Sequence, residues 1–167
     1  MQDDNLILDQ LVSAKRQLRL AIITETYPPE INGVAMTTGR MVSALQQQGH
    51  WIELIRPKQH AGDVASENEA LEEVLHRGIP IPRYSGLKFG LPAKRKLMTR
   101  WKLRRPDLVH VVTEGPLGWS AIAAARVLKI PVTSDFHTNF HTYSQHYGLG
   151  WLQKPVNAYL RKFHNQT

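Results

Sequence analysis

Apolar residues along this chain occur both in short continuous runs and at helical spacing. Short runs rich in β-branched residues are typical of strands that are buried on both faces of a sheet. Four segments have this character: residues 18–24, 51–57, 107–113 and 130–136. Apolar positions that recur every three or four residues predict helices instead. Three segments show this second pattern: residues 33–48, 93–105 and 115–129.

Strands and helices therefore alternate along the chain, with short links between them. This order favours an α/β fold with a doubly wound parallel sheet, in which helices cover both faces. Two segments fit less well: residues 67–76 have some helical character, and residues 79–84 (IPIPRY) suit an edge strand because prolines would interrupt a central ladder. We expect one Rossmann-like domain over residues 18–167, preceded by an extension at residues 1–17.

Topology indicates where a ligand would bind before any motif is considered. In doubly wound sheets, ligands occupy the crevice beyond the carboxyl ends of the strands. Three loops follow predicted central strands: residues 24–33 (TETYPPEING), 113–118 (TEGPLG) and 136–142 (FHTNFHT). We expect all three loops to share one rim of the molecule.

The first of these loops ends in Asn32 and Gly33, at the predicted start of a helix. A glycine there lets the backbone approach a ligand closely, and the helix N-terminus favours a phosphate. The alternative is a tight turn that uses glycine only for its backbone freedom. Arg40 follows Gly39 where a Walker loop has lysine, and no G-x-G-x-x-G follows the first strand, so a P-loop enzyme and an ordinary dinucleotide fingerprint are both excluded.

Histidines at positions 137 and 141 raise the question of a metal site, because a four-residue spacing places two imidazoles on one helical face. A zinc protease helix needs glutamate directly after the first histidine, whereas Thr138 stands there. The position of His137, directly after a central strand, is more informative. There it either faces the ligand crevice, where it can hold a sugar hydroxyl or a developing charge, or caps the following helix.

Composition narrows the function classes. The chain has 167 residues, no cysteine and a net charge of +7. A disulfide scaffold, a thiol nucleophile and a thiolate zinc site are thus excluded. The N-terminus is acidic where a signal peptide needs positive charge, and no apolar run approaches the about 20 residues of a membrane span. We therefore expect a soluble, cytoplasmic protein.

The excess charge lies in one segment. Seven basic residues stand between Pro92 and Pro106, with no acidic residue among them: Lys94, Arg95, Lys96, Arg100, Lys102, Arg104 and Arg105. The other 14 basic residues balance the 14 acidic ones. Such a patch suits an anionic lipid surface or nucleic acid, and the alternative is a solvated helix face. With Leu97 and Trp101 between the charges, we expect a peripheral contact with an anionic membrane and no nucleic-acid partner.

Three stretches, in order, resemble a known family. They are residues 18–50 (LRLAIITETYPPEINGVAMTTGRMVSALQQQGH), 105–143 (RPDLVHVVTEGPLGWSAIAAARVLKIPVTSDFHTNFHTY) and 147–150 (YGLG). Together they resemble the N-terminal domain of retaining glycosyltransferases of the GT-B fold, of the family-four kind that includes phospholipid and glycolipid mannosyltransferases. The resemblance covers about residues 18–166.

The resemblance implies roles for particular residues. The glycine at Gly33, next to Asn32, would approach the donor diphosphate, and His137 would contact the donor sugar near the reacting carbon as the catalytic residue. The acceptor would lie against five residues: Glu30, Glu114, Thr138, Asn139 and Tyr143. The donor would be a nucleotide diphosphate sugar such as GDP-mannose or UDP-hexose, the acceptor a lipid or saccharide, and no metal or resident cofactor would take part.

Family members have a second Rossmann-like domain, which binds most of the nucleotide sugar and carries a pair of glutamates. This chain ends at Thr167, where such a domain would begin. We therefore expect the 167 residues alone to be inactive, because catalysis at a domain interface needs both walls. Two rival hypotheses stay open: a non-catalytic α/β module that binds a phosphorylated ligand or an anionic surface, and a metal-dependent hydrolase built on the two histidines.

Overall fold

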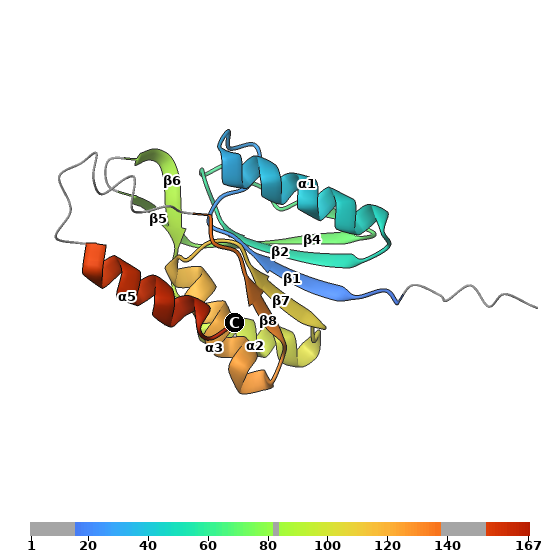
Figure 1. Ribbon diagram of the computed structural model, residues 1–167. Coiled ribbons are helices and arrows are strands. Elements are labelled where there is room, and N and C mark those ends of the chain that lie inside the picture. Colours follow the sequence, from blue (N-terminus) through green and yellow to red (C-terminus); the bar gives the residue numbers. More distant parts are fainter. Residues whose placement is uncertain (1–15, 82–83, 138–152) are drawn as a thin grey trace, which may run out of the picture.

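A mostly parallel six-stranded sheet forms the centre of the molecule (Figure 1). The computed structural model describes residues 16–81, 84–137 and 153–167. The strands of this sheet are β1 (Arg19–Ile23), β2 (Trp51–Pro57), β3 (Glu67–Asn68), β4 (Leu71–His76), β7 (Leu108–Val111) and β8 (Val132–Ser134). Their order is β3-β4-β2-β1-β7-β8, and every pair is parallel except β3 with β4.

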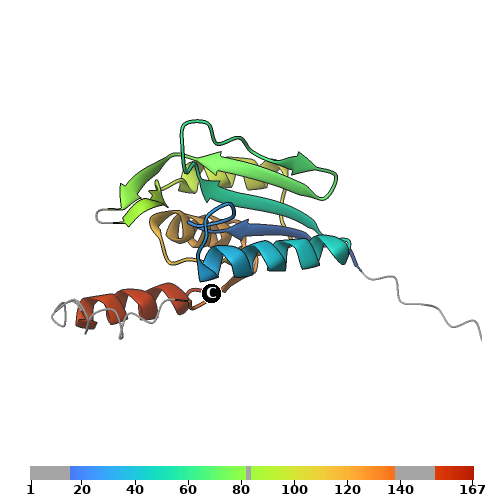
Figure 2. The same ribbon diagram turned by 90° about the horizontal axis from the view of Figure 1, so that it is seen from above.

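Helices cover both faces of this sheet. One face carries α1 (Gly33–Gln47), and the other carries α2 (Lys94–Leu103), α3 (Pro116–Leu128) and α5 (Gln153–His164). Figure 1 shows α1 above the sheet and the other three helices below it, and Figure 2 shows α1 lying along the strands. The predicted doubly wound α/β fold is confirmed, and it is consistent with the Rossmann-like half of a GT-B fold.

The strand order reverses at β1. From β1 the chain moves outward through β2 to β4, and it then returns to the other side of β1 to form β7 and β8. The carboxyl ends of β1 and β7 are therefore neighbours from which the chain departs in opposite directions. In sheets of this kind such a switch point is where the loops leave a crevice for a ligand.

Strand β1 shows why a continuous apolar run predicts a central strand. Ala21 and Ile23 pack in the cluster beneath α2 and α3, whereas Leu20 and Ile22 pack in the cluster beneath α1. All four side chains are buried, because both faces of the sheet are covered. Burial of each large aliphatic side chain stabilises the fold by about 1.5–3 kcal/mol.

Helix α1 begins and ends where the sequence predicts. Asn32 is its N-cap, since the Asn32 side chain accepts a hydrogen bond from the amide of Ala35 at 2.8 Å. Gly49 lies just beyond the C-terminus in the left-handed region, with φ of 86°. Glycine adopts this conformation without a Cβ clash, which accounts for the stop.

The helical assignment of residues 67–76 is wrong. This segment forms β3 and β4, and β4 pairs in parallel with β2 from Ile52–Leu71 to Pro57–His76. Leucine and glutamate are good helix formers, but β2 would otherwise present a bare edge, and pairing with it supplies the backbone hydrogen bonds of β4.

Residues 79–84 are partly confirmed as strand. Residues Gly78–Ile81 form β5, which pairs with β6 (Tyr84–Gly90) in a separate two-stranded antiparallel sheet, with an irregularity between Pro80 and Ile81. Strand β6 and helix α5 are absent from the sequence prediction. The sequence of α5 is clearly amphipathic, so its period was a usable signal that the prediction overlooked.

Helix α2 has its apolar stripe where the sequence predicts, but this stripe faces inward. Ala93, Leu97 and Trp101 are buried against the sheet and α3, and the Trp101 indole Nε1 donates to Glu53 Oε2 at 2.8 Å. An aromatic residue on a basic helix packs into the core in preference to a membrane surface, because burial in the core removes its apolar surface from water completely. The expected contact of the basic side chains of this helix with an anionic membrane stays a prediction.

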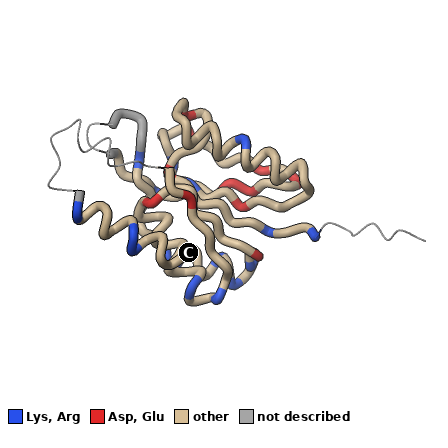
Figure 3. The backbone as a smooth tube through the Cα atoms, viewed as in Figure 1, with Lys and Arg blue, Asp and Glu red and all other residues tan. Residues whose placement is uncertain are grey.

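Part of the basic patch is neutralised inside the protein. Arg100 pairs with Glu53 and Glu72, and Arg104 pairs with Glu72 at 3.1 Å. In Figure 3 the basic positions gather mainly on the layer of α2, α3 and α5, while acidic positions lie along the sheet. No helix within the described ranges has the length and apolar composition needed to span a bilayer.

Candidate functional site

The chain leaves β1, β7 and β8 at one edge of the sheet, as predicted, and of the third predicted loop, residues 136–142, the structure describes Phe136 and His137. The amide of Glu25, after β1, donates to Thr113 Oγ1, after β7, at 2.8 Å. The amide of Asp135, after β8, donates to the carbonyl of Val111 at 3.0 Å. These bonds hold the three loops together as one surface, which we call the rim.

Glu25 lies at the centre of the rim and is almost fully buried. Its carboxylate accepts hydrogen bonds from the amides of Gly90, at the end of β6, and Leu117, in the first turn of α3. Burial raises the pKa of Glu25 to about 7, and the two amide bonds oppose this effect. The side chain thus ties the first loop to β6 and to the N-terminus of α3.

The rest of the first loop forms a small polar network around Glu30. Thr26 Oγ1 donates to Glu30 Oε2 and accepts from Asn32 Nδ2 at 2.7 Å. Burial raises the pKa of Glu30, while the hydrogen bond from Thr26 lowers it. Glu30 Oε1 is buried and has no hydrogen-bond partner among the described residues. A predicted acceptor-lining residue thus carries an unused oxygen in this loop.

Gly33 stands at the first position of α1, and no backbone strain requires a glycine there. Among the glycines in the described part of the chain, only Gly49 has a positive φ, so Gly33 is not in a left-handed turn. A Cβ added at Gly33 would meet no atom within 4 Å. The explanation by a tight turn therefore fails, and the open space favours the close approach of a ligand.

His137 is oriented by the aspartate two residues before it. His137 Nε2 lies 3.1 Å from Asp135 Oδ2, and the same oxygen lies 3.1 Å from His110 Nε2. His110 Nδ1 is 2.9 Å from Thr133 Oγ1, its cross-strand neighbour between β7 and β8. If both Nε2 atoms donate to Asp135, His137 Nδ1 has a lone pair available to accept a hydrogen bond from a ligand hydroxyl.

Glu114 faces α5 more than open solvent. Its side chain is 8% exposed, and its Oε1 lies 3.4 Å from His164 Nε2. The hydroxyl of Tyr159 donates to the Glu114 carbonyl, and Tyr159 also stacks on Trp119 of α3 with ring centroids 5.8 Å apart. Burial raises the pKa of Tyr159, and the charges of Glu114 and Glu25 raise it further.

The remaining predicted site residues, Thr138, Asn139 and Tyr143, lie outside the described residues, as does His141. Within the ranges that the structure describes, no group of three His, Asp or Glu side chains is arranged to hold a metal ion. Among the described residues, the side chain of His137 forms a hydrogen-bonded pair with the carboxylate of Asp135. Such a pair orients an imidazole toward a substrate.

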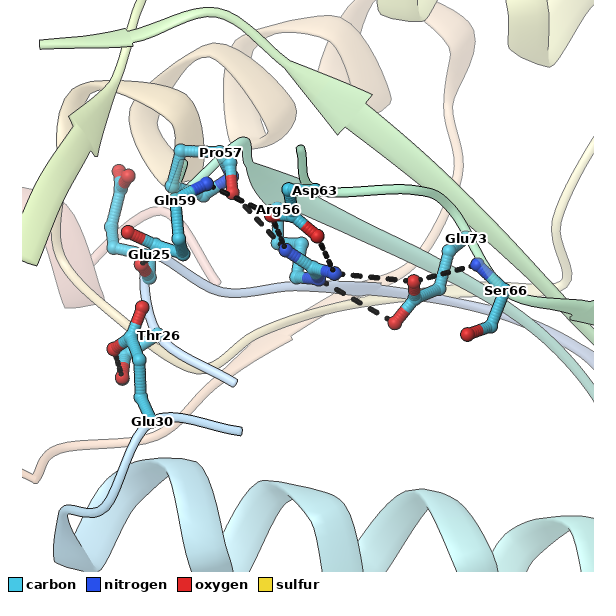
Figure 4. Close-up of polar contacts among 9 residues, drawn as sticks. All are labelled: Glu25, Thr26, Glu30, Arg56, Pro57, Gln59, Asp63, Ser66 and Glu73. Atoms are coloured by element: carbon cyan, nitrogen blue, oxygen red, sulfur yellow. Dashed lines mark hydrogen bonds and ion pairs between the residues drawn. The ribbon is translucent and has the colours of Figure 1, made fainter. Parts of the chain in front are cut away.

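A buried ion-pair network supports the rim from the side of β2 and β4. Arg56 is 4% exposed, donates to both oxygens of Asp63 at 2.7 and 3.0 Å, and pairs with Glu73 at 3.3 Å. Figure 4 shows the guanidinium of Arg56 between these two carboxylates. The backbone amide of Gln59 donates a hydrogen bond to Asp63. The side-chain Nε2 of Gln59 donates a second one to the backbone carbonyl of Glu25 at 3.0 Å. The network thereby fixes a loop that braces the rim.

Sequence reasoning missed Glu25, Asp135 and the Arg56 network. For Glu25 a signal exists, because it is a carboxylate just beyond a buried strand, where the rim was expected. Asp135 stands near the end of the predicted strand 130–136, beside the same rim. For Arg56 the signal is a lone arginine inside an otherwise apolar strand, which requires buried acidic partners. Their partners, separated by up to 92 residues, are visible only in the fold.

Comparison with known proteins agrees with this geometry. The sequence model of Glycosyltransferase Family 4 matches residues 31–167. A GDP-mannose-dependent alpha-mannosyltransferase of Mycolicibacterium smegmatis is 27% identical over 160 residues, which cover 90% of this chain and 40% of the relative. The enzyme of the same name from Corynebacterium glutamicum is 29% identical over 153 residues, covering 90% of this chain and 36% of the relative.

An alpha-monoglucosyldiacylglycerol synthase of Streptococcus pneumoniae is 28% identical over 138 residues, which cover 83% of this chain and 31% of the relative. The chain thus spans well under half the length of these curated relatives. The family match covers most of the chain, from the end of the first rim loop at Ile31 to Thr167. The chain therefore belongs to Glycosyltransferase Family 4.

Proposed function

We propose that this chain is the acceptor-side domain of a retaining, metal-independent glycosyltransferase. It transfers a hexose from a nucleotide diphosphate sugar to a hydroxyl of a lipid or saccharide. The observation that carries the proposal is the rim itself: in a member of this family, an open helix N-terminus at Gly33 and an oriented His137 share the carboxyl edge of one parallel sheet. The relatives include a GDP-mannose-dependent mannosyltransferase and a monoglucosyldiacylglycerol synthase, which support GDP-mannose as one donor and a glycosylated diacylglycerol as one product.

The donor diphosphate lies at the start of α1. The Asn32 side chain occupies the amide of Ala35, and among the hydrogen bonds of the described residues the amides of Gly33 and Val34 have no acceptor. These two amides and the positive end of the helix dipole suit a phosphate oxygen. The absence of a Cβ at Gly33 lets that oxygen reach the backbone.

The donor sugar lies against His137, whose Nδ1 accepts a hydrogen bond from a sugar hydroxyl while Asp135 holds the ring. This orientation positions the sugar for attack by the acceptor. The acceptor hydroxyl group binds near Glu30, whose free oxygen is a ready acceptor of a hydrogen bond. Glu114 does not contact the acceptor directly in this proposal, because its carboxylate faces His164 of α5.

We also propose that the protein works at the inner surface of the cytoplasmic membrane. The exposed residues Lys94 and Lys102 of α2 would contact anionic headgroups, together with Leu103 of the same helix, which is 83% exposed. Each basic side chain near such a surface contributes about 1 kcal/mol. Sedimentation with anionic and neutral vesicles tests this contact, and equal binding to both would contradict it.

A transfer assay tests the hexosyltransferase proposal. The chain is joined after Thr167 to a nucleotide-sugar-binding domain from a relative, and labelled GDP-mannose and UDP-glucose are offered with diacylglycerol acceptors. We expect transfer with the joined protein and none with the 167 residues alone. His137→Ala should abolish transfer, whereas His50→Ala, at the opposite edge of the sheet, should leave it intact.

Two results would overturn the proposal. Robust transfer by the 167-residue chain alone would show that no second wall is needed. Donor binding without transfer in every joined protein would instead favour a non-catalytic module that binds a phosphorylated ligand.

A further inference from the structure

A cavity of about 630 Å³ opens between β4 and the outer side of α2. Its walls include His76 and Arg77 from the end of β4 and Arg95, Lys96, Arg100 and Arg104 from α2. In the sheet order, β2 stands between β4 and β1. The cavity is therefore separate from the rim at the β1–β7 switch point, and the proposed transfer reaction leaves it without a role.

The cavity exists because α2 leaves the flank of β4 uncovered. The apolar stripe of α2 turns inward, toward the cluster that it shares with α3 and β1. The side of α2 that faces β4 is polar, and Arg100 crosses to Glu53 and Glu72 on the neighbouring strands β2 and β4. Charged side chains thus line the space beside the helix.

Positive charge on the cavity walls exceeds negative charge. Glu53 and Glu72 pair with Arg100 and Arg104. Arg77, Arg95 and Lys96 form no ion pair with any described residue, so three cations surround one space without a counter-charge. All three side chains are exposed, so solvent screens them in part, but like charges around one space still repel one another, and an anion bound among them would remove that repulsion.

We propose that this cavity binds a phosphate group, held by Arg77, Arg95 and Lys96. Arginine presents a planar fork of N–H donors that matches two phosphate oxygens, and lysine adds a compact positive charge. The space is much larger than one phosphate, so the group enters as part of a phosphorylated headgroup or a phosphorylated metabolite. The exposed Leu103 on the wall provides an apolar neighbour for the rest of that ligand.

His76 provides a reporter inside the cavity. Burial lowers the pKa of His76, and the charges of Lys96 and Arg100, which face it from α2, lower it further. The positive field of the cavity thus reaches the imidazole. A phosphate bound in this field would oppose it, so the pKa of His76 should rise on binding.

NMR of the 167-residue chain tests the proposal with inorganic phosphate as the probe. The His76 imidazole signals, assigned with His76→Gln, are titrated with phosphate against chloride at equal ionic strength. We expect a saturable shift, complete below about 50 mM phosphate, and a higher pKa of His76 in its presence. Because the site is not needed for hexosyl transfer, this result does not depend on the transfer assay.

Two paired variants separate a site from general attraction. Arg95→Gln with Lys96→Gln removes two charges from the cavity wall, and Lys94→Gln with Lys102→Gln removes two exposed charges of the same helix that do not line it. We expect the first pair to weaken phosphate binding at least about tenfold and the second less than about twofold. Equal losses in both pairs, or no saturation in the wild-type chain, would overturn the proposal.

Vesicles identify the source of the phosphate group. If a lipid headgroup occupies the cavity, the Arg95/Lys96 pair of substitutions reduces sedimentation with phosphatidylglycerol vesicles more than the Lys94/Lys102 pair does, and inorganic phosphate competes. If a free metabolite occupies it, the Arg95/Lys96 pair reduces vesicle binding no more than the Lys94/Lys102 pair does, while the NMR difference persists. Phosphatidylcholine vesicles serve as the neutral control.

Discussion

Asp63→Asn tests whether the Arg56 network braces the rim. The wild-type carboxylate accepts hydrogen bonds from both terminal nitrogens of the Arg56 guanidinium and from the backbone amide of Gln59. The side chain of Gln59 in turn donates to the backbone carbonyl of Glu25. Asparagine keeps the size of the side chain but offers one carbonyl oxygen and turns an NH₂ group toward the guanidinium. The substitution therefore breaks the bidentate pair and loosens the loop that supports Glu25.

The size of the effect follows from the titration of Asp63. The hydrogen bonds from Arg56 lower the pKa of Asp63 from 3.8 to about 2. Since one pKa unit corresponds to about 1.4 kcal/mol, the network stabilises the folded chain by about 2 kcal/mol through this carboxylate. This lies below the about 3–5 kcal/mol expected when a buried charge loses its sole partner, because Glu73 still pairs with Arg56.

The pH dependence has a defined sign. Because the folded-state pKa of Asp63 is lowered, its contribution is complete above the unfolded pKa of about 4 and is lost as the pH falls toward 2. About half of it remains at pH 3. The free energy of unfolding of Asp63→Asn should thus be about 2 kcal/mol lower than that of wild type at pH 7, and about 1 kcal/mol lower at pH 3.

Urea denaturation followed by circular dichroism at the two pH values measures this difference. Glu67→Gln is the matched control, because Glu67 is an exposed carboxylate on β3, and we expect it to change the free energy of unfolding by less than about 0.5 kcal/mol. A loss below about 1 kcal/mol for Asp63→Asn at pH 7, or a difference that does not shrink at pH 3, would refute the network described here.

Three further substitutions probe the rim and the core beside it. Because burial raises the pKa of Glu25 to about 7, wild type should lose about 2 kcal/mol of stability relative to Glu25→Gln between pH 5 and 7.5, and parallel urea-denaturation profiles would contradict this. A Cβ at Gly115 would overlap the Glu25 carboxylate, so Gly115→Ala should cost about 1–3 kcal/mol in thermal melts, whereas Gly62→Ala, with its nearest atom at 3.7 Å, should cost less than about 0.5 kcal/mol. Trp101→Phe leaves Glu53 Oε2 without its buried donor and should cost about 2–4 kcal/mol in urea denaturation; a loss under about 1 kcal/mol would place the indole outside the core.

The fold could be predicted where a segment carries its own signal. Residues 18–24 place apolar side chains on both faces of the sheet, so their continuous run identifies a central strand without knowledge of its neighbours. Residues 67–76 carry a helical composition, and only the exposed edge of β2 turns them into strands. Local pattern fails where a neighbouring strand supplies the hydrogen bonds.

The same division applies to the site. His137 and Gly33 could be selected because each directly follows a predicted element boundary at the carboxyl edge. The carboxylate of Glu25 could not be assigned a role, because its partners Gly90 and Leu117 stand 65 and 92 residues away. Topology thus predicts which edge of a sheet is functional, but not which polar side chains the protein uses to build that edge.

The use of Glu25 determines where the rim can bind a phosphate. Two helices, α1 and α3, begin directly after β1 and β7, and both N-termini would attract an anion. The α3 terminus is already filled, because the Glu25 carboxylate accepts the amide of Leu117 and occupies the space beside Gly115. The α1 terminus keeps the amides of Gly33 and Val34, with open space where a Cβ would stand. Of the two helix ends at the switch point, only that of α1 is open to a donor diphosphate.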